Sequence, residues 1–328
     1  MKKIGILFGG ENSFPGALVA RINESHVEGI AAEFVSTGAV RFDRPSNYAV
    51  IVDRISHAVP FYRAFLKHAA LHGAVVINNP FWASADDKFF NDSLAVKLGV
   101  AVPATVLLPH KLLPPGASEH TMRNLEYPLD WEAVFAAVGE HGFLKPIDGG
   151  GWRDVREVRG REEFFRAYDE TRDLCMVYQT AIDFSEYFRC YVVGRKKVRI
   201  MAYDPRRPHA ERYVTDPSPT RKTLLKRMRK DAIKLCKALG YDFNTVEFAV
   251  KNGTPYAIDF MNPVPDADLH SVGQANFDWI VEAFAEMAIS RAKAVRPAPD
   301  VRGLAFFGAI KSSSPQVAKS GTKKTSAI

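Results

Sequence analysis

The sequence predicts a small α/β domain at the N-terminus, followed by a larger α+β region. Residues 1–85 alternate strand-like apolar runs with segments of helical spacing, a pattern typical of a parallel sheet covered by helices. From residue 142 onward, several strand-like runs follow one another with few helices between them, which indicates antiparallel pairing. The length of 328 residues and the hydrophobic content of 47% give enough core for two or three subdomains.

The individual elements follow from apolar runs and from the residues that bound them. In the first region we expect strands at 4–8, 31–36, 48–53 and 74–80, and helices at 16–23 and 60–73. The second of these helices starts at Pro60 and ends at Gly73, as helices commonly do. Further helices are expected within 84–99 and at 131–141, 219–239 and 277–294, and strands at 142–147, 176–180, 187–194, 196–204, 245–253 and 254–260.

Composition narrows the class of protein. The formal net charge is +7, but residues 311–328 carry four lysines and no acid, which leaves +3 for residues 1–310. The basic balance is therefore partly a property of a polar tail that we expect to be disordered, and it is weak support for nucleic-acid binding. No apolar run approaches 18 residues, so we expect no membrane span. Three cysteines without CxxC spacing indicate reduced thiols in a cytoplasmic protein.

The stretch AIDFMNPVPD at 257–266 ends a strand in polar residues. The preceding sequence VEFAVKNGTPYAIDF predicts a hairpin, and folding it would bring Glu247 close to Asp259, with Asn262 just past the strand end. Two carboxylates and an amide oxygen suit Mg²⁺ when a phosphate completes the coordination. From the residues alone, solvent-facing acids with an Asn-Pro turn explain the pattern about equally well.

Two other stretches carry polar groups at strand ends. In GFLKPIDGGGW, Lys145 ends a strand and is followed by glycines whose N–H groups can approach phosphate oxygens closely, although a plain hairpin loop is the commoner explanation. This spacing matches neither the P-loop nor the Rossmann fingerprint. In the segment 176–207, backbone after Tyr178 and Gln179 could pair with an adenine edge, and Glu186 could accept from a ribose; ordinary sheet polarity stays open here.

The order of these motifs resembles the ATP-grasp superfamily over about residues 1–295. The ordered set is SADDK, then GVAVPAT, the strand with Lys145 and its glycine loop, the QT hinge, and Glu247 with Asp259 and Asn262. More narrowly, it is similar to the branch of glutathione synthetases, D-alanine–D-alanine ligases and ribosomal-protein glutamate ligases. The resemblance implies an α/β domain at 1–85, ATP-grasp subdomains at 86–182 (with a glycine-rich lid) and 183–303 (with the metal site), and a disordered basic tail at 311–328.

The resemblance also implies roles for particular residues. Lysines and the glycine loop would hold the ATP phosphates, the hinge would hold adenine and ribose, and acids with an amide would hold Mg²⁺, or Mn²⁺ in its place. The implied ATP-binding residues are Lys88, Lys145, Asp148, Gly149, Gly150, Gly151, Trp152, Tyr178, Gln179, Thr180, Ala181, Glu186 and Arg189. The implied metal ligands are Glu247, Asp259 and Asn262, and the implied catalytic residues are Arg199 at the acyl-phosphate centre and Lys145.

The expected activity is an ATP-dependent ligase that joins a small-molecule or peptide carboxylate to an amine through an acyl phosphate. The family usually reads acid-x-Asn-Pro, whereas Asp259-Phe-Met-Asn262 has one extra residue, so we expect a β-bulge if both side chains face the metal. One alternative is an ATP-grasp kinase acting on a hydroxyl. Another is a nucleic-acid-binding protein that uses the basic helix 219–239, but its apolar stripe is that of an ordinary amphipathic helix. Members of the family often form dimers or tetramers, so a homodimer is one expectation.

Overall fold

The fold, taken from a computed structural model that describes residues 1–81, 87–208, 211–214 and 219–294, contains three four-stranded sheets. The first sheet uses residues 2–77, the second residues 105–180 and the third residues 186–259. The predicted boundaries near residues 85 and 182 fall between sheets and stay a prediction. The predicted tail at 311–328 and the end of the last predicted subdomain lie outside the described residues.

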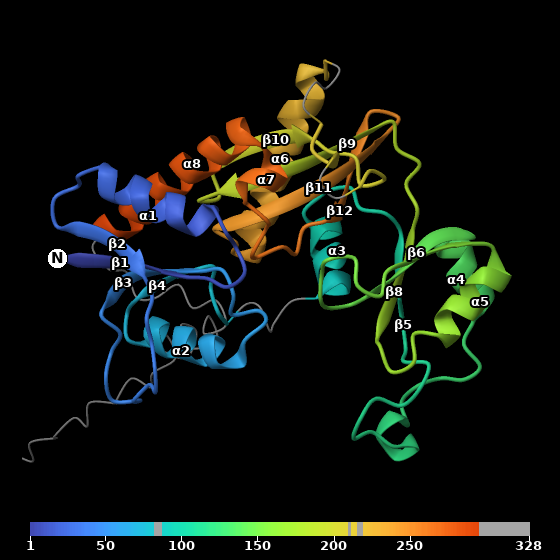
Figure 1. Cartoon of the computed structure of the whole chain (residues 1–328). Coiled ribbons are helices and arrows are strands. Elements are labelled where there is room, and N and C mark those ends of the chain that lie inside the picture. Colours follow the sequence, from blue (N-terminus) through green and yellow to red (C-terminus); the bar gives the residue numbers. More distant parts are fainter. Residues whose placement is uncertain (82–86, 209–210, 215–218, 295–328) are drawn as a thin grey trace, which may run out of the picture.

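The first sheet is parallel throughout, as predicted, with strand order β2-β1-β3-β4. Its strands are β1 (Lys2–Leu7), β2 (Ile30–Phe34), β3 (Tyr48–Asp53) and β4 (Val75–Ile77). Helix α2 (Pro60–Leu71) packs on one face, and α1 (Phe14–Glu24) lies on the other beside the C-terminal helix α8 (Gln274–Lys293), as Figure 1 shows. Buried apolar side chains on both faces explain why these strands read as nearly continuous apolar runs.

The second sheet is antiparallel, with order β5-β8-β6-β7. It comprises β5 (Thr105–Leu108), β6 (His141–Pro146), β7 (Arg156–Arg159) and β8 (Met176–Thr180), with α4 (Trp131–Val138) and α5 (Arg161–Asp169) on its outer side. A 3-10 helix lies at Glu119–Met122, and α3 (Lys88–Lys97) precedes the sheet. Strand β7 and helix α5 were not predicted, because α5 buries only three of its nine residues and the chain there is highly charged.

The third sheet is also antiparallel, with order β10-β9-β11-β12. Its strands are β9 (Glu186–Val193), β10 (Lys197–Ala202), β11 (Phe243–Lys251) and β12 (Thr254–Asp259). The predicted turn at Asn252-Gly253 is confirmed, since both residues have positive φ and Lys251 pairs with Thr254.

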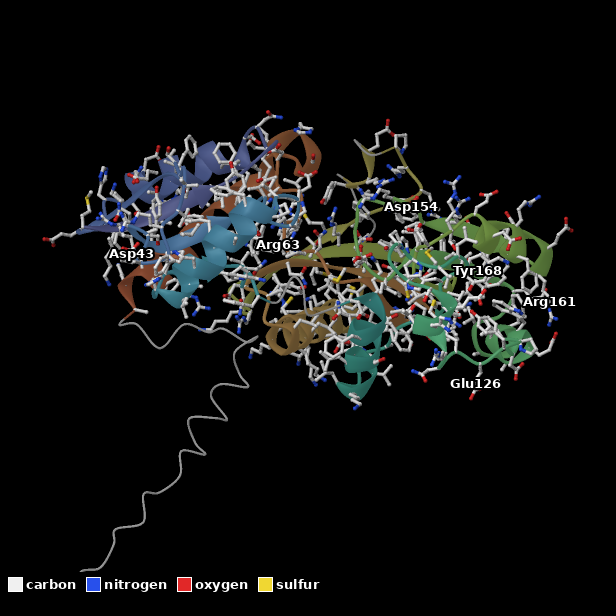
Figure 2. All side chains as sticks on the ribbon, turned by 90° about the horizontal axis from the view of Figure 1, so that it is seen from below. Asp43, Arg63, Glu126, Asp154, Arg161 and Tyr168 are labelled. Carbon is white, nitrogen blue, oxygen red and sulfur yellow. The ribbon has the colours of Figure 1, made fainter. Side chains whose placement is uncertain are left out.

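Helices cover both faces of the third sheet. Helix α6 (Lys222–Leu239) packs on one face, and α8 covers part of the other face, where Tyr191 and Phe243 contact it. The short α7 (Leu269–Val272) precedes α8. Because α8 lies between the first and third sheets, these sheets share one hydrophobic core. The second sheet extends away from this core, so that Asp43 and Arg161 lie at opposite ends of the molecule in Figure 2.

The sequence also led us to expect reduced cysteines and no membrane span. The three cysteines are free of disulfides, and Cys190 and Cys236 are buried. In the part of the chain that the structure describes, no helix is both long enough and apolar enough to cross a membrane.

Candidate functional site

A cavity of about 400 Å³ lies between the second and third sheets. Strands β6 and β8 and the loop after β6 form one wall, and β9, β11 and β12 form the other. The predicted residues that line it are Lys88, Lys145, Asp148, Gly149, Gly150, Gly151, Trp152, Gln179, Thr180, Arg189, Glu247, Asp259 and Asn262. The fold therefore gathers most of the predicted side chains around a single space.

Two lysines reach this cavity from different elements. Lys88 is the first residue of α3, which Asp87 caps by accepting from the backbone N–H of Phe90. Its Nζ donates to the carbonyl oxygen of Gly149 at 2.9 Å, and Lys145 Nζ donates to Gln179 Oε1 at 2.7 Å. Burial lowers the pKa of both lysines, and the nearby carboxylate of Asp259 opposes this shift. The two ammonium groups converge on one place where an anion could bind.

The glycine loop connects β6 to β7 and presents backbone to the cavity. Gly149 and Gly151 have φ of +80° and +70°, a conformation that favours glycine. Trp152 follows in the same left-handed region, with φ of +63°, and it is half exposed. The centroid of its ring lies 6.4 Å from the centroid of the Phe143 ring and 5.9 Å from the guanidinium carbon of Arg212. The loop thus touches both walls of the cavity.

The opposite wall contains a β-bulge, but it lies before Asp259 and not between Asp259 and Asn262, where the sequence predicted one. Glu247 pairs with Asp259 and Phe248 pairs with Ala257, so Ile258 is the extra residue. Glu247, Ile258 and Asp259 all line the cavity, whereas Ala257 is buried under α6. The extra residue in this sequence therefore turns the Asp259 carboxylate to the same side as Glu247.

Asn262 and Glu247 are fixed by neighbouring hydroxyl groups. Asn262 Nδ2 donates to Thr245 Oγ1 at 2.8 Å, which leaves its amide oxygen as the acceptor. Glu247 Oε2 accepts from Tyr187 at 2.6 Å, and Arg189 Nε lies 3.6 Å from Glu247 Oε1. Burial raises the pKa of Glu247, and Arg189 works against that rise.

These oxygens form a donor set that suits a hard divalent cation together with phosphate oxygens. The described residues contain no group of three or more His, Cys, Asp or Glu side chains able to hold a metal by themselves. Two carboxylates and one amide at this place fit Mg²⁺ only when a bound phosphate contributes ligands. This is the arrangement that the sequence indicated.

Of the four predicted hinge residues, Gln179 and Thr180 line the cavity, whereas Tyr178 and Ala181 do not. The side chain of Tyr178 points away from the cavity into the core under α4 and α5, where its hydroxyl donates to the carbonyl of Gly139. Thr180 and Ala181 use their N–H groups on the carbonyls of Ala104 and His141. The side chain of Tyr178 faces away from the cavity because side chains alternate across β8, and these two N–H groups are already bonded within the protein.

Residues just after the hinge line the cavity instead. Ile182 and Phe184 supply apolar surface there, and Arg206 lies 4.5 Å above the Phe184 ring. Glu186 does not line the cavity, and its carboxylate accepts from Thr220 Oγ1 at 3.2 Å. The structure therefore gives no support to Glu186 as a ribose acceptor.

The predicted catalytic arginine also needs correction. Arg199 Nε donates to Asn276 Oδ1 on α8 at 2.9 Å, and Arg199 does not line the cavity. Arg189 and Arg212 line it instead. Arg199 lies further along the sheet than Arg189, where α8 already covers this face. In the sequence, Arg206, Arg207 and Arg212 lie close together after β10, and this density of arginines is the signal that could have pointed to Arg212.

Asp92 was missed entirely. It lies on α3, one turn after Lys88, and is only 7% exposed. Burial raises its pKa to about 6, against the hydrogen bonds from Thr105 and Gln179 that favour the charged form. A strand-like or helical pattern does not reveal such a residue, because its partners come from β5 and β8.

Comparison with solved structures shows that the chain has the ATP-grasp fold. A D-alanine–D-alanine ligase from Bacillus anthracis matches with a TM-score of 0.61 and 16% identity, over 89% of this chain and 97% of that one. The same enzyme has also been solved with ATP, at a TM-score of 0.58, 15% identity and the same coverage.

Two other likenesses are of the same kind. The RimK domain protein ATP-grasp from Sphaerobacter thermophilus DSM 20745 matches with a TM-score of 0.61 and 18% identity, over 89% of this chain and 100% of that one. The ATP-grasp ligase PsnB, solved with minimal precursor, Mg and ADP, matches with a TM-score of 0.58 and 12% identity, over 89% and 98%. No protein-family model matches the sequence, and no curated protein does.

Proposed function

We propose that this protein is an ATP-dependent carboxylate–amine ligase that works through an acyl phosphate. The observation that carries the proposal is the convergence in one cavity of two lysine ammonium groups and a glycine loop, facing two carboxylates and an amide oxygen. The ATP-grasp fold supports it, since the similar structures include a D-alanine–D-alanine ligase solved with ATP and the ligase PsnB solved with Mg and ADP.

The lysines and the glycine loop would hold the nucleotide phosphates. Phosphoryl transfer depends on positioning and on neutralising the charge of the transferring group. Lys88 and Lys145 bring two positive charges to the cavity from different elements, and the loop at 148–152 brings backbone N–H groups. Neither lysine has an ion pair of its own among the described side chains, so both charges can be used on a ligand.

Glu247, Asp259 and Asn262 would hold Mg²⁺ beside these phosphates. When bound there, the cation supplies charge neutralisation for the transferred phosphoryl group. The residues then have the task of keeping their oxygens on one side, which the bulge at Ile258 and the bond from Asn262 Nδ2 to Thr245 achieve.

The reaction would proceed in two steps, formation of an acyl phosphate and its aminolysis. A carboxylate oxygen of the first substrate attacks the γ-phosphorus of ATP, and the bond to the ADP oxygen breaks. The amine nitrogen then attacks the acyl carbon, phosphate leaves with the C–O bond electrons, and the nitrogen loses a proton. Arg189 and Arg212 line the cavity, and in this proposal they would stabilise the oxyanion that forms at that carbon.

A substrate screen tests the proposal. Purified protein is given ATP, Mg²⁺ and pools of amino acids and dipeptides, and phosphate release and product mass are measured. A ligase releases phosphate only when both a carboxylate and an amine are present, and its product gains the mass of the amine less one water. A stable phosphoester would instead identify a kinase.

Two variants make the screen specific. Lys145→Ala should lose turnover, whereas Lys97→Ala, an exposed lysine on the same helix as Lys88, should not. Equal turnover in folded Lys145→Ala and wild-type protein would refute the assignment of the phosphate site.

A further inference from the structure

A buried chain of hydrogen bonds leads from helix α3 to the ammonium group of Lys145. Thr105 Oγ1 and Gln179 Nε2 donate to the same oxygen, Asp92 Oδ2, at 2.8 and 3.0 Å. On the other side of the amide, Gln179 Oε1 accepts from Lys145 Nζ at 2.7 Å. Gln179 is only 4% exposed, so its amide has no bulk water as an alternative partner.

Only one orientation of the Gln179 amide satisfies the donors and acceptors on both of its sides. A carboxylate only accepts, and an ammonium only donates. The NH₂ group of Gln179 must therefore face Asp92, and its oxygen must face Lys145. If the amide turned over, its NH₂ group would face the Lys145 ammonium and its oxygen would face the Asp92 carboxylate, which leaves two buried repulsive contacts.

The chain also connects the two lysines of the site. Asp92 follows Lys88 by four residues on α3, so both side chains lie on the same face of that helix. Lys88 reaches the glycine loop through the carbonyl of Gly149, and Asp92 reaches Lys145 through Gln179. A small hollow behind the cavity contains Lys88, Asp92, Lys145 and Gln179 together with Asp259.

We propose that Asp92 and Gln179 are positioning residues that fix the ammonium of Lys145 at the phosphate end of the cavity. Asp92 sets the orientation of the Gln179 amide, and the amide oxygen holds Lys145 from behind. Helix α3 therefore places one lysine directly and the other through two side chains. This inference rests on the proposed function, because it takes Lys145 to be a phosphate contact.

Exchange of the two functional groups tests the proposal. In Gln179→Glu, two carboxylates face each other across the former hydrogen bond. In Asp92→Asn, residue 92 can both accept and donate, so it no longer restricts the Gln179 amide to one orientation. The double variant Asp92→Asn/Gln179→Glu restores a donor facing an acceptor at that contact, and it still presents an oxygen to Lys145. A double-mutant cycle on these positions isolates their coupling.

The measurements are the affinity for ATP·Mg²⁺ and for ADP·Mg²⁺ by calorimetry, and the melting temperature without nucleotide. Each single variant should weaken nucleotide binding about tenfold or more. Residues that orient a metal ligand by a hydrogen bond commonly change affinity by that factor when mutated, and we expect the same for residues that orient Lys145. The double variant should recover most of the loss. Asp231→Asn, at a buried carboxylate on α6 away from the cavity, should bind nucleotide like the wild type.

The possible failures are distinguishable. If Lys145→Ala binds nucleotide as tightly as the wild type, the phosphate role itself is wrong, and the positioning role falls with it. If Lys145→Ala weakens binding but folded Asp92→Asn and Gln179→Glu do not, the positioning role alone is wrong. It is also overturned if the single variants lower the melting temperature and nucleotide affinity together and the double variant recovers neither.

Discussion

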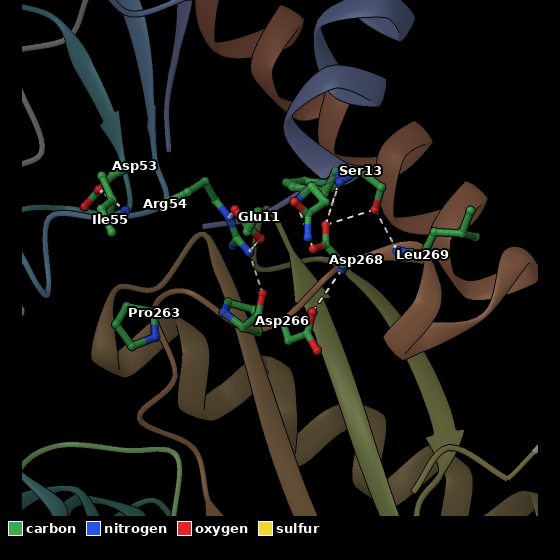
Figure 3. A network of polar contacts seen from close by, with 12 residues as sticks. Glu11, Ser13, Asp53, Arg54, Ile55, Pro263, Asp266, Asp268 and Leu269 are labelled. Atoms are coloured by element: carbon green, nitrogen blue, oxygen red, sulfur yellow. Dashed lines mark hydrogen bonds and ion pairs between the residues drawn. The ribbon is translucent and has the colours of Figure 1, made fainter. Parts of the chain in front are cut away.

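Asp268 caps helix α1 from the far end of the chain. Its Oδ1 accepts from the backbone N–H groups of Ser13 and Phe14 at 3.0 and 3.1 Å and from Ser13 Oγ at 2.9 Å, and its Oδ2 accepts from Asn12 N at 3.0 Å (Figure 3). Ser13, the N-cap residue, makes no capping bond with its own side chain. A negative charge at this helix terminus is also favoured by the helix dipole.

The magnitude of this contact follows from the titration of Asp268. Burial by itself would raise the pKa, but the four hydrogen bonds outweigh it and lower the pKa to about 2. The difference from an ordinary aspartate corresponds to at most about 2 kcal/mol of stability. Because the folded pKa is depressed, this stability is present above the unfolded pKa and is lost as the pH falls toward the folded pKa.

We therefore expect Asp268→Asn to lower the free energy of unfolding by about 1 to 2 kcal/mol at pH 7. The difference between variant and wild type should shrink between about pH 4 and pH 2, as the wild-type carboxylate takes up its proton. Denaturant unfolding at a series of pH values measures both quantities. The matched control is Asp278→Asn on α8. The Asp278 carboxylate is exposed and accepts a hydrogen bond from Gln274, one helical turn earlier.

Two results would refute this reasoning. One is a difference between Asp268→Asn and wild type that stays constant from pH 7 to pH 2.5. The other is equal stability of Asp268→Asn and Asp278→Asn at pH 7. Either result would mean that the charge of Asp268 contributes little and that its bonds are replaceable by those of an amide.

Four further outcomes are expected. Asn262→Ala should raise the Mg²⁺ concentration needed for turnover, with partial rescue by Mn²⁺ and little change in apo melting temperature, since lost metal affinity can be offset by mass action. Protease cleavage within 148–153 should slow when ATP·Mg²⁺ is added; an unchanged rate would contradict a lid role. Arg212→Ala should lower turnover at least tenfold, whereas Arg199→Ala should act mainly on stability through its lost bond to α8. Lys88→Ala should weaken turnover less than Lys145→Ala, because the Lys88 ammonium lies where water screens it more.

Local patterns were sufficient for most of the first and third sheets. Proline and glycine bounded α2, and Asn252-Gly253 specified a hairpin whose two strands pair as expected. The bulge itself was predicted at the wrong place, because the extra residue before Asn262 lies beyond the end of β12, whereas the unpaired residue in the ladder is Ile258.

The sequence predicted cavity-lining residues correctly where the local pattern of one strand, loop or hairpin was enough to place them. The glycine loop, Lys145 and the pair of Glu247 with Asp259 were found in this way, and all line the cavity. The sequence did not show which side chains of β8 face the cavity. Tyr178 and Gln179 are neighbours on β8, and the residue that reaches the cavity with its side chain is Gln179.

The sequence by itself therefore determined the elements, their pairing within hairpins and the types of group available for a phosphate and metal site, because these depend on residues close together in the chain. Only the tertiary structure decided which groups meet. Helix α8 covers the face around Arg199, whereas Arg189 on the same face lines the cavity. Asp92 reaches Gln179 across 87 positions, and Asp268 caps α1 across more than 250. The physical reason is that periodicity fixes which side chains share a face, whereas the packing of distant elements fixes what that face meets.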